Sequence, residues 1–413
     1  MTYQWNIRRL TAVEQETQQQ LERELNISSA AARMLVVRGI QTAEEARAFV
    51  RPSLDKLHDP FLMKDMDKAV ERLHQAITKG EKILIYGDYD VDGTTAVALM
   101  YRFLQNLASN LSPLTFNLDY YIPDRYTEGY GVSQQGIDYA AEQDCSLIIT
   151  LDCGIKAVEK VAYAASKGID IIVCDHHTPG DELPAAVAVL NMKRSDCPYP
   201  YKDLSGCGVG FKLAQAYTQR YLASSLSPDS LIALLPLTQL LAMSIASDIV
   251  PITGENRILA HYGIKQMNQA PFTGLSAIID VAGIENRKLT ISELVYKIGP
   301  RINACGRMKS GRAAVELLLT DDPNFARQQA EEVNQHNEDR RDCDMETTKE
   351  ALAMLEEDTT FAQRRSTVVY APHWHKGVVG IVASRLTETY YRPTIVLTAG
   401  EDGIISGSAR SVG

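Results

Sequence analysis

The sequence has few of the features that mark a secreted or membrane-bound protein. Its seven cysteines are odd in number and include no C-x-x-C pair, which argues against both a disulfide framework and a zinc ribbon. Residues 1–10 have no apolar core behind a basic start, so no signal peptide is expected. The most apolar run, 231–246, is shorter than the ~20 residues that span a bilayer and contains Pro236. We therefore expect a cytoplasmic protein without membrane contact, in which this run forms a buried helix.

Basic residues are also fewer than acidic ones. The 413 residues include 42 Lys and Arg against 52 Asp and Glu, a formal net charge of −10. Proteins that coat nucleic acid over their whole surface are usually basic, so this total argues against that class but not against a local basic channel. Residues 321–358 hold 13 of the acids and only four of the bases, so most of the excess lies on one segment.

The chain does contain a regular alternation of short apolar runs and helical patterns from residue 82 onward. The apolar runs lie at 82–87, 117–123, 146–152 and 170–175, and the helical patterns between them at 93–108, 133–143 and 155–168. This alternation predicts an α/β fold with a parallel, doubly wound sheet that is covered on both faces. The polar stretch 322–358 predicts a long connecting helix, and 366–413 predicts a second, smaller α/β unit.

Acidic and histidine side chains cluster where we expect strands to end. In open α/β sheets, side chains at the carboxyl ends of the strands converge on one crevice. So many unpaired carboxylates would raise one another's pKa, and divalent cations resolve this conflict. Carboxylates with one or two imidazoles suit manganese or magnesium, and a pair of such ions is a common arrangement for phosphodiester chemistry. The clusters are Asp88 to Asp92 in DYDVDG, Asp152 in TLDCG, Asp175 to His177 in DHH, and Asp248 in SIASDIVP.

Other interpretations of DYDVDG agree less well with the sequence. A calcium loop would need a bidentate Glu at its twelfth position, where this chain has Leu99. Asp90 to Thr94 also matches the D-x-D-G-T motif of haloacid-dehalogenase phosphatases, but His176 and His177 occupy the place of their paired acidic motif. A single Asp after a strand is most often a turn residue. Four such clusters in one sheet favour a shared metal site instead.

An ordered set of motifs runs from about residue 50 to the end of the chain. The set comprises YGDYDVDG (86–93), IPDRYTEGYG (122–131), LDCG (151–154), VCDHH (173–177), SDIVP (247–251), GPRINACGR (299–307), HKGVVGIVASR (375–385) and GSARS (407–411). It resembles the RecJ family of single-strand-specific 5′→3′ DNA exonucleases within the DHH phosphoesterase superfamily. The resemblance implies four parts: an N-terminal helical segment (1–60), a DHH catalytic domain (61–255), a basic clamp region with the long acidic helix (256–358), and a DHH-associated substrate-binding domain (359–413).

The resemblance also implies roles for the clustered side chains. His177 would touch the scissile phosphate, and Asp152 would bridge two Mn²⁺ or Mg²⁺ ions, so that with Asp92 these three count as catalytic. Two such ions would activate a water for in-line attack on phosphorus, so no covalent nucleophile is needed. The implied metal ligands are Asp88, Asp90, Asp92, Asp152, His176 and Asp248.

Positive charge for a DNA substrate is expected in two places, in residues 286–312 and at Arg410 in the GSARS motif. Residues 286–312 hold seven basic side chains against one acid, and within them Arg301, Asn303 and Arg307 suggest a phosphate clamp in a Gly-containing turn. In the family the second domain closes over the metal crevice, which implies a grip on the 5′ end that admits only single strands. Tyr126 and Tyr130 either stack on bases or pack in the core. The further substrate-binding residues implied are Arg125, His375, Gly377, Ser408 and Arg410.

We thus expect a nuclease that releases 5′-mononucleotides from single-stranded DNA during recombination and repair. One alternative is a DHH phosphodiesterase for short oligonucleotides or cyclic dinucleotides, whose relatives generally lack the long helix and the R-I-N-A-x-G-R motif. The other is a non-catalytic DHH replication scaffold, which would not need an intact set of acids and histidines. We further expect a monomer that works with a single-strand-binding protein and a helicase. The oligonucleotide-binding barrel usual in the family is expected to be absent, because GSARS ends two residues before Gly413.

Overall fold

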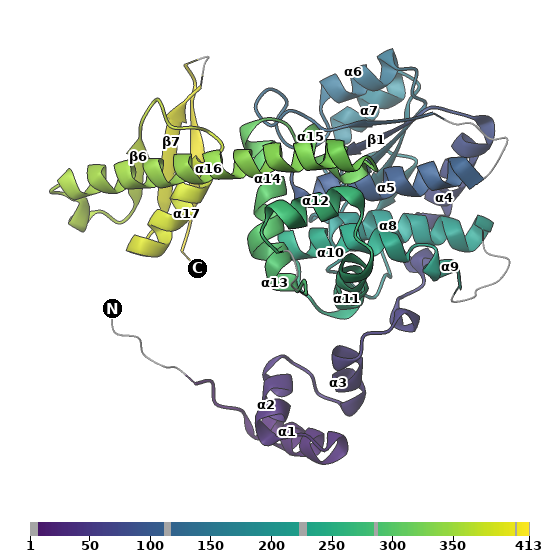
Figure 1. Cartoon of the computed structure of the whole chain (residues 1–413), viewed down its shortest axis with the longest axis horizontal. Coiled ribbons are helices and arrows are strands. Elements are labelled where there is room, and N and C mark those ends of the chain that lie inside the picture. The colour runs from purple at the N-terminus through teal and green to yellow at the C-terminus, as the bar shows by residue number, and fades with distance from the viewer. Residues whose placement is uncertain (1–6, 111–116, 223–228, 285–287, 401–402, 413) are drawn as a thin grey trace.

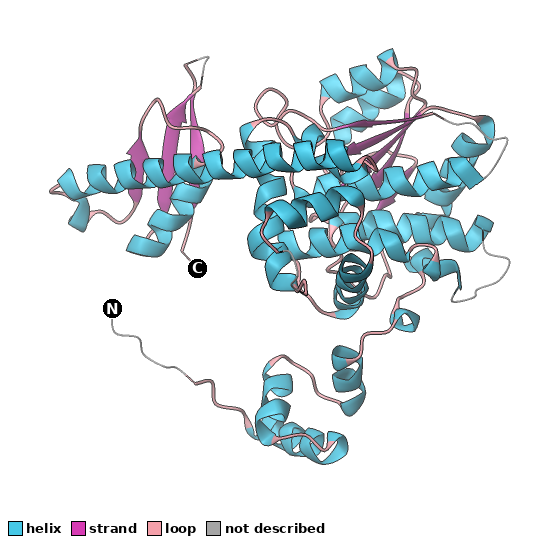
Figure 2. Cartoon of the chain, viewed as in Figure 1, coloured by secondary structure: helices cyan, strands magenta, loops and turns pink. Residues whose placement is uncertain are grey.

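The computed structural model of the chain describes residues 7–110, 117–222, 229–284, 288–400 and 403–412 (Figure 1). A large α/β body and a small α/β unit lie at the two ends of one long helix, and a group of N-terminal helices projects from the body (Figures 1 and 2). Among the described residues, no helix combines the length and the apolarity that are needed to cross a bilayer.

The body is built on a five-stranded parallel sheet with the order β2-β1-β3-β4-β5. Its strands are β1 (Ile83–Gly87), β2 (Leu118–Tyr121), β3 (Leu147–Leu151), β4 (Asp170–Cys174) and β5 (Ala188–Leu190). The predicted parallel sheet is therefore confirmed, and its first four strands lie within the expected apolar runs. Three residues are too few to give β5 a recognisable pattern, and it was not expected.

Helices cover both faces of this sheet. Ile83 and Ile85 of β1 pack into a core that includes helices α4 (Met66–Lys79), α5 (Val91–Asn110) and α8 (Gly206–Tyr217). Leu84 and Tyr86 point to the opposite face and pack with α6 (Gln134–Glu142) and α7 (Val158–Ser166). Because alternate residues of a strand face opposite sides, both faces of β1 are apolar, as the doubly wound prediction requires.

The apolar run 231–246 does not form the single helix that we expected. Pro236 separates α9 (Asp229–Ile232) from α10 (Thr238–Ser247) with a short 3₁₀ turn, η4 (Leu235–Leu237), because proline lacks the backbone N–H that a continuous helix needs. The helices that follow along the chain are α11 (Gly254–Gln269), α12 (Thr273–Val281), α13 (Ile291–Glu293), η5 (Leu294–Ile298), α14 (Gly299–Met308) and α15 (Gly311–Leu319).

The long helix α16 (Pro323–Glu357) joins the body to the small unit. It begins at Asp322, whose carboxylate accepts hydrogen bonds from the backbone N–H groups of Asn324 and Phe325. Ala330 and Val333 belong to the core of the body, whereas Ala351 and Leu355 belong to the core of the small unit. The predicted connecting helix is thus confirmed, and it is a structural member of both parts.

The small unit has a three-stranded sheet with the order β6-β7-β8, in which β8 is antiparallel to β7. Its inner face packs on α16 and α17, and its outer face exposes apolar side chains such as Val368 and Ile395. Its elements are β6 (Thr367–Tyr370), α17 (Val379–Tyr390), β7 (Thr394–Ala399) and β8 (Ile405–Arg410).

The N-terminal helices have a separate small core around Leu21, Ala32 and Val36. They are α1 (Ala12–Leu25), α2 (Ser29–Val37) and α3 (Ala43–Val50). The remaining short helical segments of the chain are η1 (Leu54–Lys56), η2 (Pro60–Leu62), η3 (Thr218–Leu222) and η6 (Phe361–Gln363).

Candidate active site

Three of the four acidic clusters follow neighbouring strands, as predicted. Asp88 comes directly after β1, Asp152 after β3, and Asp175 after β4. The expectation that Asp248 also follows a strand was wrong. Asp248 caps the carboxyl end of α10, and it reaches the same crevice because this helix packs beneath the sheet in the same core.

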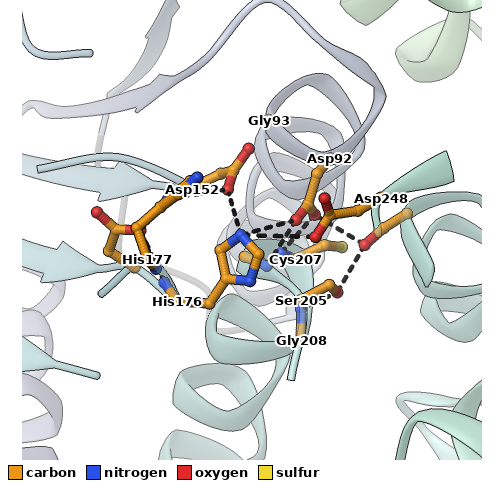
Figure 3. A network of polar contacts seen from close by, with 12 residues as sticks. Asp92, Gly93, Asp152, His176, His177, Ser205, Cys207, Gly208 and Asp248 are labelled. Atoms are coloured by element: carbon orange, nitrogen blue, oxygen red, sulfur yellow. Dashed lines mark hydrogen bonds and ion pairs between the residues drawn. The ribbon is translucent and has the colours of Figure 1, made fainter. Parts of the chain in front are cut away.

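Three of the candidate metal ligands, Asp92, Asp152 and Asp248, lie around the ring of His176 (Figure 3). Its Nε2 lies 3.2 Å from Asp152 Oδ1, 3.6 Å from Asp248 Oδ2 and 3.8 Å from Asp92 Oδ2. Groups whose ligand atoms all lie within 4.8 Å of one another are Asp92, His176 and Asp248; Asp152, His176 and His177; and Asp88, Asp90 and Asp152. Since Asp152 and His176 each belong to two groups, the cluster has room for more than one ion.

A backbone contact determines which nitrogen of His176 carries the proton. The ring Nδ1 lies 3.1 Å from the carbonyl oxygen of Leu204. A carbonyl only accepts, so Nδ1 must donate to it, and Nε2 presents its lone pair to the carboxylates. An imidazole held in this way by a backbone carbonyl has the usual arrangement of a metal ligand.

Asp92 is held by the N-terminus of α8. Its carboxylate accepts hydrogen bonds from the backbone N–H groups of Gly206 at 2.7 Å and Cys207 at 2.8 Å, and from the Ser244 hydroxyl at 2.7 Å. The positive end of a helix dipole favours a carboxylate at this position. We did not identify these partners from the sequence, although Ser205 before an apolar helix was a recognisable N-cap.

Asp152 lies in a strained backbone conformation. Its φ of 61° is in the left-handed region, which costs energy for a residue with a side chain. Gly206 packs so closely against it that an added Cβ would lie 2.5 Å from Asp152 Cβ. Strain of this kind persists only where the surroundings enforce it, which is typical of functional sites.

Asp175 orients His177. One of its carboxylate oxygens accepts hydrogen bonds from the backbone N–H groups of His176 and His177 and lies 2.8 Å from His177 Nδ1, while the other accepts from Ile155 N–H. Burial opposes ionisation of Asp175, but these hydrogen bonds, led by that of His177, outweigh it and lower its pKa. The same hydrogen bond raises the pKa of His177.

In the carboxylates of Asp88, Asp92 and Asp152, burial outweighs whatever hydrogen bonds they accept. Burial, with the nearby Asp90 as the next cause, raises the pKa of Asp88 to about 8. Burial also raises the pKa of Asp92 to about 6 and that of Asp152 well above its usual value. Three buried oxygens of the cluster, Asp88 Oδ1, Asp152 Oδ1 and Asp248 Oδ2, form no hydrogen bond with any residue that the structure describes. Buried oxygens without a donor are suitable ligands for hard divalent cations, so the donor set fits the expected metal ions.

The predicted phosphate clamp has a different local structure from the one expected. GPRINACGR forms helix α14 and not a turn, with Pro300 in its first turn where the missing N–H is no disadvantage. Arg301 donates to Asn334 of α16 and to the Lys297 carbonyl. The side-chain oxygen of Asn303 accepts the N–H of Val91 and so caps the start of α5. Arg287, which we counted in the basic segment, lies outside the described residues.

Arg307 and its neighbours connect the body with the small unit. Its guanidinium donates to the Gly377 carbonyl at 3.1 Å, and its own carbonyl accepts from the Tyr126 hydroxyl. The Gly377 N–H in turn donates to His375 Nδ1 at 3.0 Å. Burial, followed by the proximity of Arg125, lowers the pKa of Arg307. Two cations close together in a partly desolvated place favour an anionic ligand.

The remaining predicted DNA contacts lie at the edges of the two parts. Arg125 lies over the Tyr89 ring at 4.9 Å. On β8, Arg410 donates to Ser408 and to Ser384 of α17. Tyr126 and Tyr130 are both exposed, whereas Tyr120 and Tyr121 pack against other aromatic rings.

The geometry agrees with what comparison with known proteins finds. Residues 82–238 match the DHH family, N-terminal domain. This part of the chain is therefore similar to that domain. Across 99% of its length it is 39% identical to the single-stranded-DNA-specific exonuclease RecJ of Bacillus subtilis strain 168, of which it covers 49%. Over 92% of its length it is 36% identical to the Escherichia coli K12 exonuclease of the same name, of which it covers 65%.

A solved structure that matches most of the chain has a similar fold. The crystal structure of an exonuclease RecJ bound to manganese matches 87% of this chain with a TM-score of 0.73 and 29% identity, and the match covers 84% of that chain. The DHH fold predicted from the sequence is therefore confirmed. The chain spans between about half and two thirds of the length of these curated relatives.

Proposed function

We propose that this chain is the catalytic part of a metal-dependent exonuclease that removes mononucleotides from the 5′ end of single-stranded DNA. The observation that carries this proposal is the set of three buried carboxylate oxygens in the acidic cluster, on Asp88, Asp152 and Asp248, that form no hydrogen bond with a described residue. A site of this kind suits two divalent cations, and the chain is similar to exonucleases of which one has been solved with manganese.

The proposed ligands are the six that we predicted from the sequence. Asp152 and His176 each belong to two groups of potential ligands, which supports a bridging role for Asp152. Bound Mn²⁺ or Mg²⁺ would supply Lewis acidity and a more acidic water for phosphodiester hydrolysis. His177, oriented by Asp175, would donate a hydrogen bond to the scissile phosphate. The ligands are Asp88, Asp90, Asp92, Asp152, His176 and Asp248.

We assign the DNA strand to the region between the body and the small unit. The proximity of the Arg125 and Arg307 cations supports this path, because a phosphate there would relieve their repulsion. His375, Gly377, Ser408 and Arg410 would contact the same strand from the small unit. The substrate-binding roles of Arg301 and Asn303 stay predictions, because both side chains already have protein partners. The four-part domain division also stays a prediction.

The test is a nuclease assay with Asp152→Asn. Asp152 Oδ1 forms no hydrogen bond with a described residue, so the isosteric amide should preserve the fold while it removes a charged ligand. We expect the wild type with Mn²⁺ to release mononucleotides from 5′-labelled single strands, and not from duplex. The Asn variant should lose this activity and bind Mn²⁺ more weakly in calorimetry, whereas Asp280→Asn at an exposed position should change neither.

Other outcomes of this assay would contradict the proposal. Faster hydrolysis of a cyclic dinucleotide or of short oligonucleotides than of long single strands would identify the related phosphodiesterase activity instead. Inactivity of the wild type on every substrate, despite Mn²⁺ binding, would indicate a scaffold. Release from 3′-labelled ends alone would reverse the proposed polarity.

The cellular setting belongs to the same proposal. An enzyme that accepts only single strands needs a helicase to separate them, and a single-strand-binding protein would cover the product strand. We propose a monomer in the cytoplasm, where the seven cysteines, all free among the described residues, would stay reduced. Light scattering with size-exclusion chromatography measures the oligomeric state directly.

A further inference from the structure

The hydroxyl of Tyr130 touches two parts of the active site at once. It donates a hydrogen bond to the carbonyl oxygen of Asp152 at 3.1 Å, and it lies 3.2 Å from Nδ1 and 3.3 Å from Nε2 of His177. The two rings meet edge to face with their centroids 5.7 Å apart. Tyr130 therefore contacts both the proposed bridging ligand and the proposed phosphate-binding histidine.

The hydrogen-bonding capacity of these groups determines the direction of each contact. A tyrosine hydroxyl has one proton, and the Asp152 carbonyl can only accept, so that proton is used there. Asp175 accepts from Nδ1 of His177, which leaves Nε2 as the nitrogen that can donate to the phosphate. The Tyr130 oxygen lies nearly equidistant from the two ring nitrogens, so it contacts the ring without taking either proton. The ring is thus held from two sides.

The contact with Asp152 occurs at a strained residue. Asp152 has a φ of 61°, so its peptide unit needs external hydrogen bonds to keep its orientation. Its N–H donates to the Cys174 carbonyl, and its carbonyl accepts from Tyr130. The hydroxyl is therefore one of two tethers on the backbone that aims the Asp152 carboxylate.

Tyr130 follows a turn that is held by its own hydrogen bonds. Asp124 accepts hydrogen bonds from the N–H groups of Tyr126 and Thr127, and Glu128 accepts from the Asp124 N–H. At the other end of this loop, Tyr126 donates to the Arg307 carbonyl, and its ring meets that of His375. One hydrogen-bonded loop thus contacts the metal cluster through Tyr130 and the small unit through Tyr126.

We propose that Tyr130 is a positioning residue, whose hydroxyl joins the Asp152 backbone to the His177 ring and so holds the phosphate-binding histidine in register with the metal ligands. This inference rests on the nuclease function proposed above. It assigns Tyr130 a role through its hydroxyl, in contrast to a role through ring stacking on a base.

The test compares Tyr130→Phe, which removes only the hydroxyl, with Tyr296→Phe at an exposed position as a matched control. We expect Tyr130→Phe to lower kcat about 10- to 100-fold, the usual loss when a group behind a ligand is removed, with KM for single-stranded DNA unchanged. In metal-free protein labelled with [¹⁵N]histidine, the ring signals of His177, assigned with His177→Gln, should shift in Tyr130→Phe. Tyr296→Phe should leave kcat and these signals unchanged.

Several results would overturn this inference. An unchanged kcat in Tyr130→Phe would do so. If KM for DNA then rose in Tyr130→Ala but not in Tyr130→Phe, the ring of Tyr130 would be assigned to DNA binding. A lower kcat with unshifted His177 signals would also contradict it, because the hydroxyl would then act elsewhere. The spectra need neither metal nor substrate, so they decide the inference even if the wild type degrades no DNA.

Discussion

At the scale of single residues, many carboxylates lie close together in this site and few hydrogen-bond donors reach them, which determines which of them are protonated. Asp175 has enough hydrogen bonds to stay ionised, and Asp92 has three donors yet a pKa raised by burial to about 6. Asp88 has a pKa of about 8 because burial leaves its Oδ1 without a donor among the described residues. Without cations, protons must therefore take over part of the charge compensation.

We predict that the stability of the metal-free protein falls as the pH rises from about 4 to about 8. In the unfolded chain Asp88 loses its proton near pH 3.8, whereas in the folded chain it keeps the proton until about pH 8. Within this window the folded state binds more protons, so the free energy of unfolding decreases with pH, by at most about 1.4 kcal/mol per pH unit for one proton. Urea unfolding in the presence of a chelator at several pH values measures this slope.

Asp88→Asn is the decisive variant for this pH dependence. It should make the slope shallower, because Asp92 and Asp152 still bind extra protons in the folded state. Saturating Mn²⁺ should do the same for the wild type, because cations replace the protons. Asp280→Asn, which is exposed, should keep the wild-type slope. An unchanged slope in Asp88→Asn would show that Asp88 is not the titrating group.

Among the elements, α14 holds the loop that carries Asp88 and Asp90 and leads into α5, where Asp92 lies. Asn303 caps the start of α5 directly after Asp90, and Gly306 packs against the backbone of Tyr89. A Cβ added at Gly306 would lie 2.5 Å from the Tyr89 carbonyl oxygen. The motif that we interpreted as a clamp for phosphate therefore supports the metal-binding loop through Asn303 and Gly306.

We predict that Gly306→Ala lowers nuclease activity far more than it lowers stability. A helical Gly→Ala change gains about 1 kcal/mol of propensity, which partly offsets about 1–3 kcal/mol of overpacking. The displaced atoms, however, lie between Asp88 and Asp90. Thermal unfolding and the nuclease assay measure the two effects. Gly180→Ala, whose added methyl would meet its nearest atom at 3.8 Å, is the control, and full activity in Gly306→Ala would contradict the prediction.

Some features of the fold and the site could be predicted from the sequence, and others could not. Strand-end positions could be found for Asp88 and Asp152 because apolar runs of strand length precede both. The helical position of Asp248 and the helical form of the R-I-N-A-x-G-R motif were missed, since short patterns do not reveal what packs around them. The donors to Asp92 were missed as well. Gly206 and Ser244 lie 114 and 152 residues away in the sequence, so only the folded chain brings them to that carboxylate.

For the whole molecule, α16 determines how the two parts are connected. Near its middle, Asp344 is fully buried and pairs with Arg385 of α17 at 2.7 Å. Its other carboxylate oxygen forms no hydrogen bond with a described residue. Burial raises the pKa of Asp344, and Arg385 is the first group that opposes this rise. This pair anchors the small unit to the long helix.

We predict that Arg385→Met destabilises the attachment of the small unit by about 1–3 kcal/mol, because it leaves a buried carboxylate without its partner. Adding Asp344→Asn should recover part of the loss, which a double-mutant cycle measures. The exposed pair of Lys309 and Glu332 provides the control, and Lys309→Met should cost less than about 1 kcal/mol. Equal effects of Arg385→Met and Lys309→Met in urea unfolding would contradict the anchoring role.

Because α16 belongs to the cores of both parts, it also sets the rotation of the small unit about the helix axis relative to the body. Each residue of α16 turns the chain by about 100° and advances it by about 1.5 Å. Deleting one residue between Val333 and Ala351 would therefore swing the small unit about a quarter of a turn while hardly changing its distance from the body. A surface loop tolerates insertions of many lengths, but in this stretch only lengths close to a whole number of turns, such as about seven or about eleven residues, would return the Arg410 edge to the same side of the molecule.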